Sequence, residues 1–208
     1  MNQCFVSIGE HVEKISKWNP IQSESSTVFK YIDLSSVDKD KKVISLHEVP
    51  LMIPSEAPSR ARQLVKSNDV IVSTVRPNLN GVGVVPEELN NATASTGYCV
   101  LRANTSTLDY RYLYYWVRTN YFVEDMMKKA TGANYPAVSD KIIKESKIPL
   151  PSISEQKRIA AILDKADSLR RKRQQAIQLA DQFLRSVFLD LFGDPVTNYK
   201  KLPIIELG

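Results

Sequence analysis

With 208 residues and 43% hydrophobic side chains, the chain is long enough for one or two domains with a buried core. Its formal charge of +5 permits binding to a polyanion without establishing it. A disulfide framework and a Cys/His metal site are both disfavoured, because the only cysteines and histidines, Cys4, Cys99, His11 and His47, lack ligand-like spacing.

The N-terminal stretch MNQCFVSIGEHVEK lacks the basic start and apolar run of a signal peptide. No apolar stretch reaches the roughly 18–20 residues that cross a bilayer. We therefore expect a cytoplasmic protein that does not enter a membrane.

Residues 1–151 are typical of an α+β (mixed) domain with short strands. The β-branched runs DVIVSTV (69–75) and GVGVV (81–85) predict two strands, joined by a turn at Asn80-Gly81. ATASTGYCVLR (92–102) alternates in the manner of a half-buried third strand. SRARQLV (59–65) is predicted as a short helix with Ser59 as its cap.

Two helical patterns follow, LDYRYLYYWVRT and NYFVEDMMKKA, with a break expected near Asn120. Their aromatic side chains suit a domain core better than base stacking. TGANYPAVS (131–139) combines Gly, Asn and Pro and is predicted to be a loop.

A single long helix is predicted for residues 152–193. Ser152-Ile153-Ser154-Glu155 matches a capping box, and Gly193 followed by Pro195 is a stop signal. Its stripe of apolar residues, broken only by Arg173, has alternating three- and four-residue spacing and comprises Ile159, Ile162, Ala166, Leu169, Ala176, Ala180, Phe183 and Val187. A rod of about 60 Å cannot bury this stripe against a small domain along its whole length. We therefore expect a coiled-coil type of helix that pairs with another helix.

Catalysis has weak support in this sequence. The nearest arrangement to a nuclease site is Asp140 with Glu145 and Lys147, which could hold Mg²⁺ and polarise water. The spacing is too short for a typical nuclease core, and a solvated charged turn is the favoured explanation of these residues.

Two polar segments carry side chains that contact DNA in other proteins. One contains Ser73, Thr74, Arg76, Asn78 and Asn80, and the other contains Lys128, Lys129, Thr131, Asn134 and Tyr135. The same residue types also build turns and complement a helix C-terminus without any ligand. On chemistry alone, both interpretations remain open.

Three long segments resemble the specificity (S) subunit of type I restriction–modification systems. They are SRARQLVKSNDVIVSTVRPNLNGVGVV (59–85), TGANYPAVSDKIIKESKIPLPSISEQKRIAAILDKAD (131–167) and LFGDPVTN (191–198). The resemblance implies a target recognition domain (1–151), a conserved spacer helix (152–193) and the start of a second, truncated recognition domain (194–208). A complete subunit of this family is about twice as long, so we expect a half or truncated subunit.

The resemblance also implies partners and the absence of catalysis. Such subunits recognise one half of a bipartite double-stranded DNA target with each recognition domain, and have no catalytic residues or cofactor of their own. Their helices dock modification subunits, which bind S-adenosylmethionine and methylate adenine, and which bring in the restriction subunit. The two polar segments, together with Arg60 and Arg62, then become candidate DNA contacts, and the basic run at 170–173 either docks a modification subunit or contacts phosphates.

A homodimer is expected, because a symmetric pair of half subunits would match a bipartite palindrome. The alternative from the residues alone is a homodimeric coiled-coil protein whose front domain binds protein.

Overall fold

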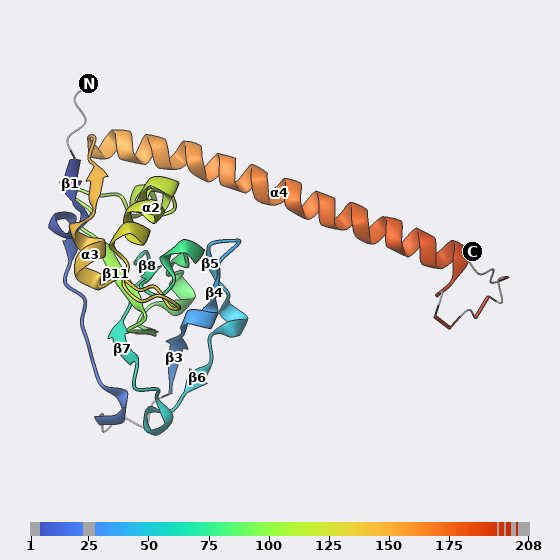
Figure 1. Cartoon of the computed structure of the whole chain (residues 1–208), viewed down its shortest axis with the longest axis horizontal. Coiled ribbons are helices and arrows are strands. Elements are labelled where there is room, and N and C mark those ends of the chain that lie inside the picture. The colour runs from blue at the N-terminus through green and yellow to red at the C-terminus, as the bar shows by residue number, and fades with distance from the viewer. Residues whose placement is uncertain (1–4, 23–27, 195, 198, 201–202, 204–208) are drawn as a thin grey trace. The chain divides into compact units, whose positions relative to one another are not determined.

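The computed structural model describes residues 5–22, 28–194, 196–197, 199–200 and 203, and Figure 1 traces the chain. Its contacts divide the chain into two compact units, Met1–Ala160 and Ala161–Gly208. The first unit mixes short strands with short helices. The long helix α4 (Ile153–Phe192) begins in the first unit, and its residues from Ala161 onward belong to the second. This combination confirms the predicted fold class.

One sheet of the first unit has the strand order β6-β3-β10-β7 among the described residues. Its strands are β6 (Leu51–Met52), β3 (Phe29–Ile32), β10 (Thr93–Ser95) and β7 (Ala61–Leu64). β10 pairs in parallel with β3 and antiparallel with β7.

The helix predicted for residues 59–65 is wrong, because this segment contains β7. Its buried residues Ala61, Gln63 and Val65 alternate with more exposed ones, which is the period of a strand. Gln63 can point inward because its Nε2 donates hydrogen bonds to the carbonyl oxygens of Ser95 (2.8 Å) and Tyr98 (2.7 Å).

A second sheet is antiparallel, with the order β2-β11-β8-β9 in the described part of the chain. Its strands are β2 (Val12–Glu13), β11 (Tyr98–Ala103), β8 (Val70–Ser73) and β9 (Val82–Val84). β8 and β9 confirm the two strands predicted on either side of the Asn80-Gly81 turn. The single strand predicted for 92–102 is split between β10 and β11, because the chain turns at Thr96-Gly97 and changes sheet.

The second sheet is covered on both faces. Val70 and Val72 of β8 belong to one hydrophobic cluster, whereas Ile71 belongs to another. The same alternation divides β11, with Leu101 on the first side and Val100 on the second. The β8–β11 pair is therefore the centre of the fold, and the turns at its ends are anchored by two cores.

The two predicted helices and the break between them are confirmed as α1 (Tyr110–Trp116) and α2 (Asn120–Lys129). Asp109 caps α1 by accepting hydrogen bonds from two backbone amides, and Thr119 caps α2. Tyr112, Tyr114 and Phe122 are buried, so the aromatic cluster is largely core, as expected.

The charged turn predicted after residue 139 is wrong. Residues Asp140–Glu145 form helix α3, which Ser139 caps through its Oγ and which buries Ile143. Strand β12 (Lys147–Pro149) follows and pairs antiparallel with β1 (Phe5–Ser7). The first strand of the described chain is thereby paired with the strand that precedes α4.

Helix α4 begins and ends where the sequence predicts. The Ser152 hydroxyl accepts a hydrogen bond from the backbone amide of Glu155 (3.4 Å). The Glu155 carboxylate does not complete a capping box but pairs with Arg158 (2.7 Å). At the other end Gly193 has φ +77°, the left-handed conformation that closes a helix.

Candidate nucleic-acid interface

A short turn links β8 to β9 and carries the first polar segment. The 3₁₀ turn Pro77–Leu79 is flanked by two residues in the left-handed region, Arg76 (φ 50°) and Asn80 (φ 46°). Left-handed backbone is unusual for arginine and commoner for asparagine. We call residues 76–80 the recognition turn, after the role expected for this segment from its sequence; the Arg76 and Asn78 side chains within it are exposed.

The recognition turn contacts the second polar segment, which lies about fifty positions later in the chain. Val75 and Thr131 both form antiparallel bridges with Ala137. The backbone amide of Arg76 donates to the carbonyl of Pro136 (2.7 Å). The guanidinium of Arg76 lies 4.4 Å from the centre of the Tyr135 ring, a distance typical of a cation–π contact.

A cavity of about 230 Å³ opens beside this contact. Its walls combine apolar, aromatic and cationic side chains, and it is lined by Leu34, Lys39, Ser73, Val75, Arg76, Leu79, Gly81, Tyr98 and Tyr135. The Tyr98 hydroxyl donates a hydrogen bond to the Asp33 carbonyl (3.0 Å). Burial raises the pKa of Tyr98, so this side chain lines the cavity as an uncharged group. An arginine over an exposed aromatic ring at a cavity rim suits contact with a phosphate or a base.

Sequence reasoning missed Lys39, which comes from the hairpin of β4 (Val37–Asp38) and β5 (Val43–Ile44). Its run DKDKK resembles an ordinary solvated hairpin tip, so only the fold places it beside the recognition turn. The left-handed Lys42 of the same hairpin donates to two carbonyls of that turn.

The other residues predicted to contact DNA differ in whether their side chains are exposed or already bonded within the protein. Thr74 is buried and its hydroxyl donates to the Gly97 carbonyl (2.9 Å), so its side chain supports the fold. The Ser73 hydroxyl donates to the Val75 carbonyl (2.9 Å). Lys128 is exposed, whereas Lys129 pairs with Asp125 (2.7 Å). Thr131 and Asn134 are exposed in the loop that carries Tyr135.

Arg60 and Arg62 lie before and within strand β7 of the other sheet, and neither lines the cavity at Arg76. Arg60 is exposed just before β7. Arg62 lies within β7, half-buried, and its guanidinium donates to the carbonyl of Ala61 (2.9 Å). The structure therefore brings the two polar segments together at this cavity, and neither arginine is part of its lining.

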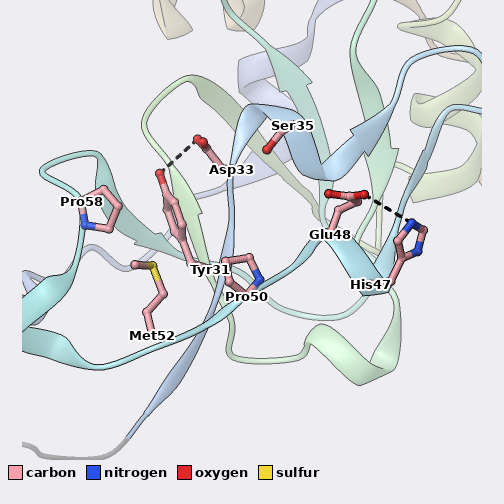
Figure 2. Close-up of a pocket in the computed structure, with 8 residues that line it drawn as sticks. All are labelled: Tyr31, Asp33, Ser35, His47, Glu48, Pro50, Met52 and Pro58. Carbon is pink, nitrogen blue, oxygen red and sulfur yellow. Dashed lines mark hydrogen bonds and ion pairs between the residues drawn. The ribbon is translucent and has the colours of Figure 1, made fainter.

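A second cavity, of about 450 Å³, has a different character (Figure 2). Carboxylate, hydroxyl, imidazole, aromatic and apolar groups line it, from Tyr31, Asp33, Ser35, His47, Glu48, Pro50, Met52 and Pro58. In Figure 2 the Tyr31 hydroxyl meets Asp33 (3.2 Å) and His47 meets Glu48 (3.5 Å). Among the described residues no group of three His, Cys, Asp or Glu side chains is placed to hold a metal ion.

Two of the three residues considered for a nuclease have separate partners. Glu145 faces Lys141 along α3 (3.7 Å), and Lys147 donates to the Ser7 hydroxyl (3.1 Å). Burial raises the pKa of Asp140, while Lys144 and Lys17 act in the opposite direction. These pairings favour a structural role for Glu145 and Lys147.

The predicted pairing stripe of α4 is exposed apart from its first member. Ile159 is half-buried and packs against the core of the first unit. Ile162, Leu169 and Phe183 are 53%, 54% and 67% exposed. The other members, Ala166, Ala176, Ala180 and Val187, are also exposed. Of the basic run, Arg170 and Arg171 both pair with Asp167.

Two further expectations concern the second domain expected at residues 194–208 and the absence of a membrane-spanning helix. Most of residues 194–208, the expected start of a second domain, lie outside the described residues. No helix in the described part of the chain is long and apolar enough to cross a membrane.

Comparison with known proteins gives a consistent result. A family model described as "Type I restriction modification DNA specificity domain" matches residues 35–179. The MjaVIII specificity subunit of a type I restriction enzyme from Methanocaldococcus jannaschii is 26% identical over 149 residues, covering 68% of this chain and 35% of that protein. The HindI specificity subunit from Haemophilus influenzae is 21% identical over 141 residues, covering 67% and 31%.

Solved structures agree with the curated sequences. The HsdS subunit from Thermoanaerobacter tengcongensis superposes with a TM-score of 0.72 at 31% identity, covering 92% of this chain and 50% of that one. A chain solved in work on complex assembly and conformational transition of the type I R-M system gives a TM-score of 0.75 at 30% identity, covering 94% and 51%. The chain thus spans about a third of these curated relatives and half of these solved chains.

Proposed function

The chain belongs to the type I restriction modification DNA specificity family, and we propose that it is the DNA sequence-recognition subunit of a type I restriction–modification complex. In this role its first unit recognises one half of a bipartite target in double-stranded DNA. The curated relatives are named specificity subunits, which supports this assignment.

The observation that carries the proposal is the meeting of the two polar segments. Arg76 and Tyr135 are far apart in sequence, yet they stack at the rim of one cavity with Lys39 on its wall. Exposed guanidinium, ammonium, amide and aromatic groups in one place can contact phosphates and base edges together. The proposed contacts at this surface are Lys39, Arg76, Asn78, Lys128, Asn134 and Tyr135.

The proposal assigns no catalytic residue and no cofactor to this chain. S-adenosylmethionine and the methylating site belong to the partner modification subunit. The separate pairings of Glu145 and Lys147 disfavour the nuclease alternative. That alternative requires Glu145→Gln to abolish Mg²⁺-dependent cleavage, and we expect no such cleavage by the wild-type chain.

For the remainder of the chain we propose the organisation that the resemblance implies. The recognition domain covers residues 1–151, the spacer helix 152–193, and a second recognition domain starts in 194–208. The exposed apolar stripe of α4 supports pairing with the same helix of a second copy. The same helix docks the modification subunits and, through them, the restriction subunit.

The proposal is tested by gel shift with random duplex DNA over a series of salt concentrations, with and without the modification subunit. We expect salt-dependent binding that becomes tighter with the modification subunit present. Indifference to both DNA and that subunit would instead favour the alternative of a coiled-coil protein whose front domain binds protein.

A further inference from the structure

Three residues other than glycine adopt left-handed backbone conformations around the recognition turn. Arg76 and Asn80 flank the turn itself, and Lys42 (φ 57°) lies at the end of the neighbouring β4–β5 hairpin. Unfavourable backbone conformations persist only where surrounding contacts hold them, and they gather at functional sites. The contacts that hold this turn are therefore of functional interest.

Lys42 provides two of these contacts. Its Nζ donates to the Asn80 carbonyl at 2.7 Å and to the Leu79 carbonyl at 3.3 Å. Both acceptors are the last carbonyls of the recognition turn. One ammonium group from the neighbouring hairpin therefore binds the C-terminal end of the turn. The Lys42 side chain is half-buried, which favours an internal role over a flexible phosphate contact.

Lys42 is itself fixed from the other side. The Tyr114 hydroxyl of α1 donates to the Lys42 carbonyl at 2.8 Å. Tyr114 is buried, and the guanidinium of Arg118 lies 4.6 Å from the centre of its ring. The Arg118 carbonyl in turn accepts a hydrogen bond from Nδ2 of Asn80 (3.4 Å). These contacts thus connect Tyr114 of α1 to Lys42 of the hairpin, Lys42 to the recognition turn, and the turn to Arg118, which follows α1 in the chain.

We propose that Lys42 is a positioning residue for sequence recognition: it holds residues 76–80 in the conformation that presents Arg76 and Asn78 to DNA. The inference rests on the proposed function and extends it, because it separates the residue that orients the contacts from those that make them. Loss of a positioning residue lowers discrimination between sequences, whereas loss of a phosphate contact weakens binding to all sequences and reduces the salt slope by about one.

The chain offers a charge-matched control in the same hairpin. Lys41 is exposed and pairs only loosely with Asp38 (3.5 Å). Lys41→Met and Lys42→Met remove the same charge from adjacent positions, so their effects on non-specific attraction should agree. Tyr114→Phe is a third variant, which removes the hydrogen bond to the Lys42 carbonyl without any change of charge.

The experiment measures affinity for the selected target and for random duplex, at several salt concentrations, using the full chain with its modification subunit. We expect Lys42→Met and Tyr114→Phe to lower the ratio of target to random affinity by about tenfold. Lys41→Met should leave this ratio unchanged, and the salt slopes of the two lysine variants should be equal.

Two outcomes would overturn the inference while leaving the proposed function intact. One is an equal ratio in Lys41→Met and Lys42→Met, and the other is a salt slope lowered only by Lys42→Met, which would make Lys42 a phosphate contact. A wild-type complex that binds target and random DNA equally would overturn the proposed function, and the inference with it. Thermal unfolding of each variant separates loss of the fold from loss of discrimination. If Lys42→Met does not fold, the ratio of target to random affinity measured for Tyr114→Phe tests the inference.

Discussion

The left-handed backbone of Arg76 and its contact with Tyr135 orient the guanidinium in the free chain, ahead of the DNA contact that we propose for it. A guanidinium held over a ring loses less conformational freedom on binding than a free side chain. Arg76 is therefore suited to a directional contact with a base edge, for which a planar fork of donors is needed.

Arg76→Lys tests this at the scale of one residue, because it keeps the charge and removes the planar fork. We expect a loss of roughly 1–3 kcal/mol in discrimination between target and random DNA, with little change in random binding.

Tyr135→Leu removes the aromatic ring that holds the Arg76 guanidinium, so it should also lower discrimination between target and random DNA. The matched control is Tyr121→Leu, since Tyr121 is exposed to a similar degree (61% against 66%) but lies on α2. Equal losses for Tyr121→Leu and Tyr135→Leu in a competition assay would contradict the role of Tyr135.

The first turn of helix α4 is held in place by a buried glutamine. Gln156 is fully buried; its Oε1 accepts from the Asp109 amide (3.0 Å) and its Nε2 donates to the carbonyls of Pro151 (2.9 Å) and Thr107 (3.1 Å). One side chain thus satisfies three backbone groups and joins the start of α4 to the cap of α1.

Gln156→Leu should destabilise the first unit by at least about 2 kcal/mol, because it leaves buried backbone groups without partners. Urea denaturation, followed by fluorescence, measures this loss. Gln175→Leu is the control at an exposed position of the same helix and should change the free energy of unfolding by less than about 0.5 kcal/mol. A small effect of Gln156→Leu would mean that the start of α4 is not fixed by this side chain.

The elements that could be predicted from sequence are those with a simple period. The boundaries of α4 and the strands β8 and β9 follow from capping residues, apolar spacing and the Asn80-Gly81 turn. β7 was missed because its inward position 63 is a glutamine, which hides the two-residue period until its partners, the carbonyls of Ser95 and Tyr98, are known. β10 and β11 were merged because sequence alone does not show that the chain changes sheet at Gly97.

For the site, the types of side chain in the sequence predicted both polar segments, but not that the two segments contact each other in the fold. The bridge between Val75 and Ala137 is long-range, so no local pattern indicates it. Lys39 and Lys42 were missed for the same reason, since their hairpin carries ordinary surface charges. Thr74 was selected by residue type, and only the fold shows that its hydroxyl is used internally.

At the scale of the whole molecule, the exposed stripe of α4 predicts a homodimer. Leu169→Glu combined with Phe183→Glu places charges in the proposed helix pair and should raise the dissociation constant by at least about 100-fold. Light scattering at micromolar concentration measures the result. Ser168→Glu with Gln182→Glu is the control, because these exposed positions have the same spacing and lie outside the stripe. A wild-type monomer at that concentration would contradict the dimer.

The most direct test of sequence recognition is selection of bound sequences from a randomised duplex by the wild-type chain with its modification subunit. We expect enrichment of one defined half-site, and of its inverted repeat at a fixed spacing if two copies bind together. Sequences that remain random after several rounds, with the protein folded and the modification subunit bound, would contradict the assignment of this chain as a sequence-recognition subunit.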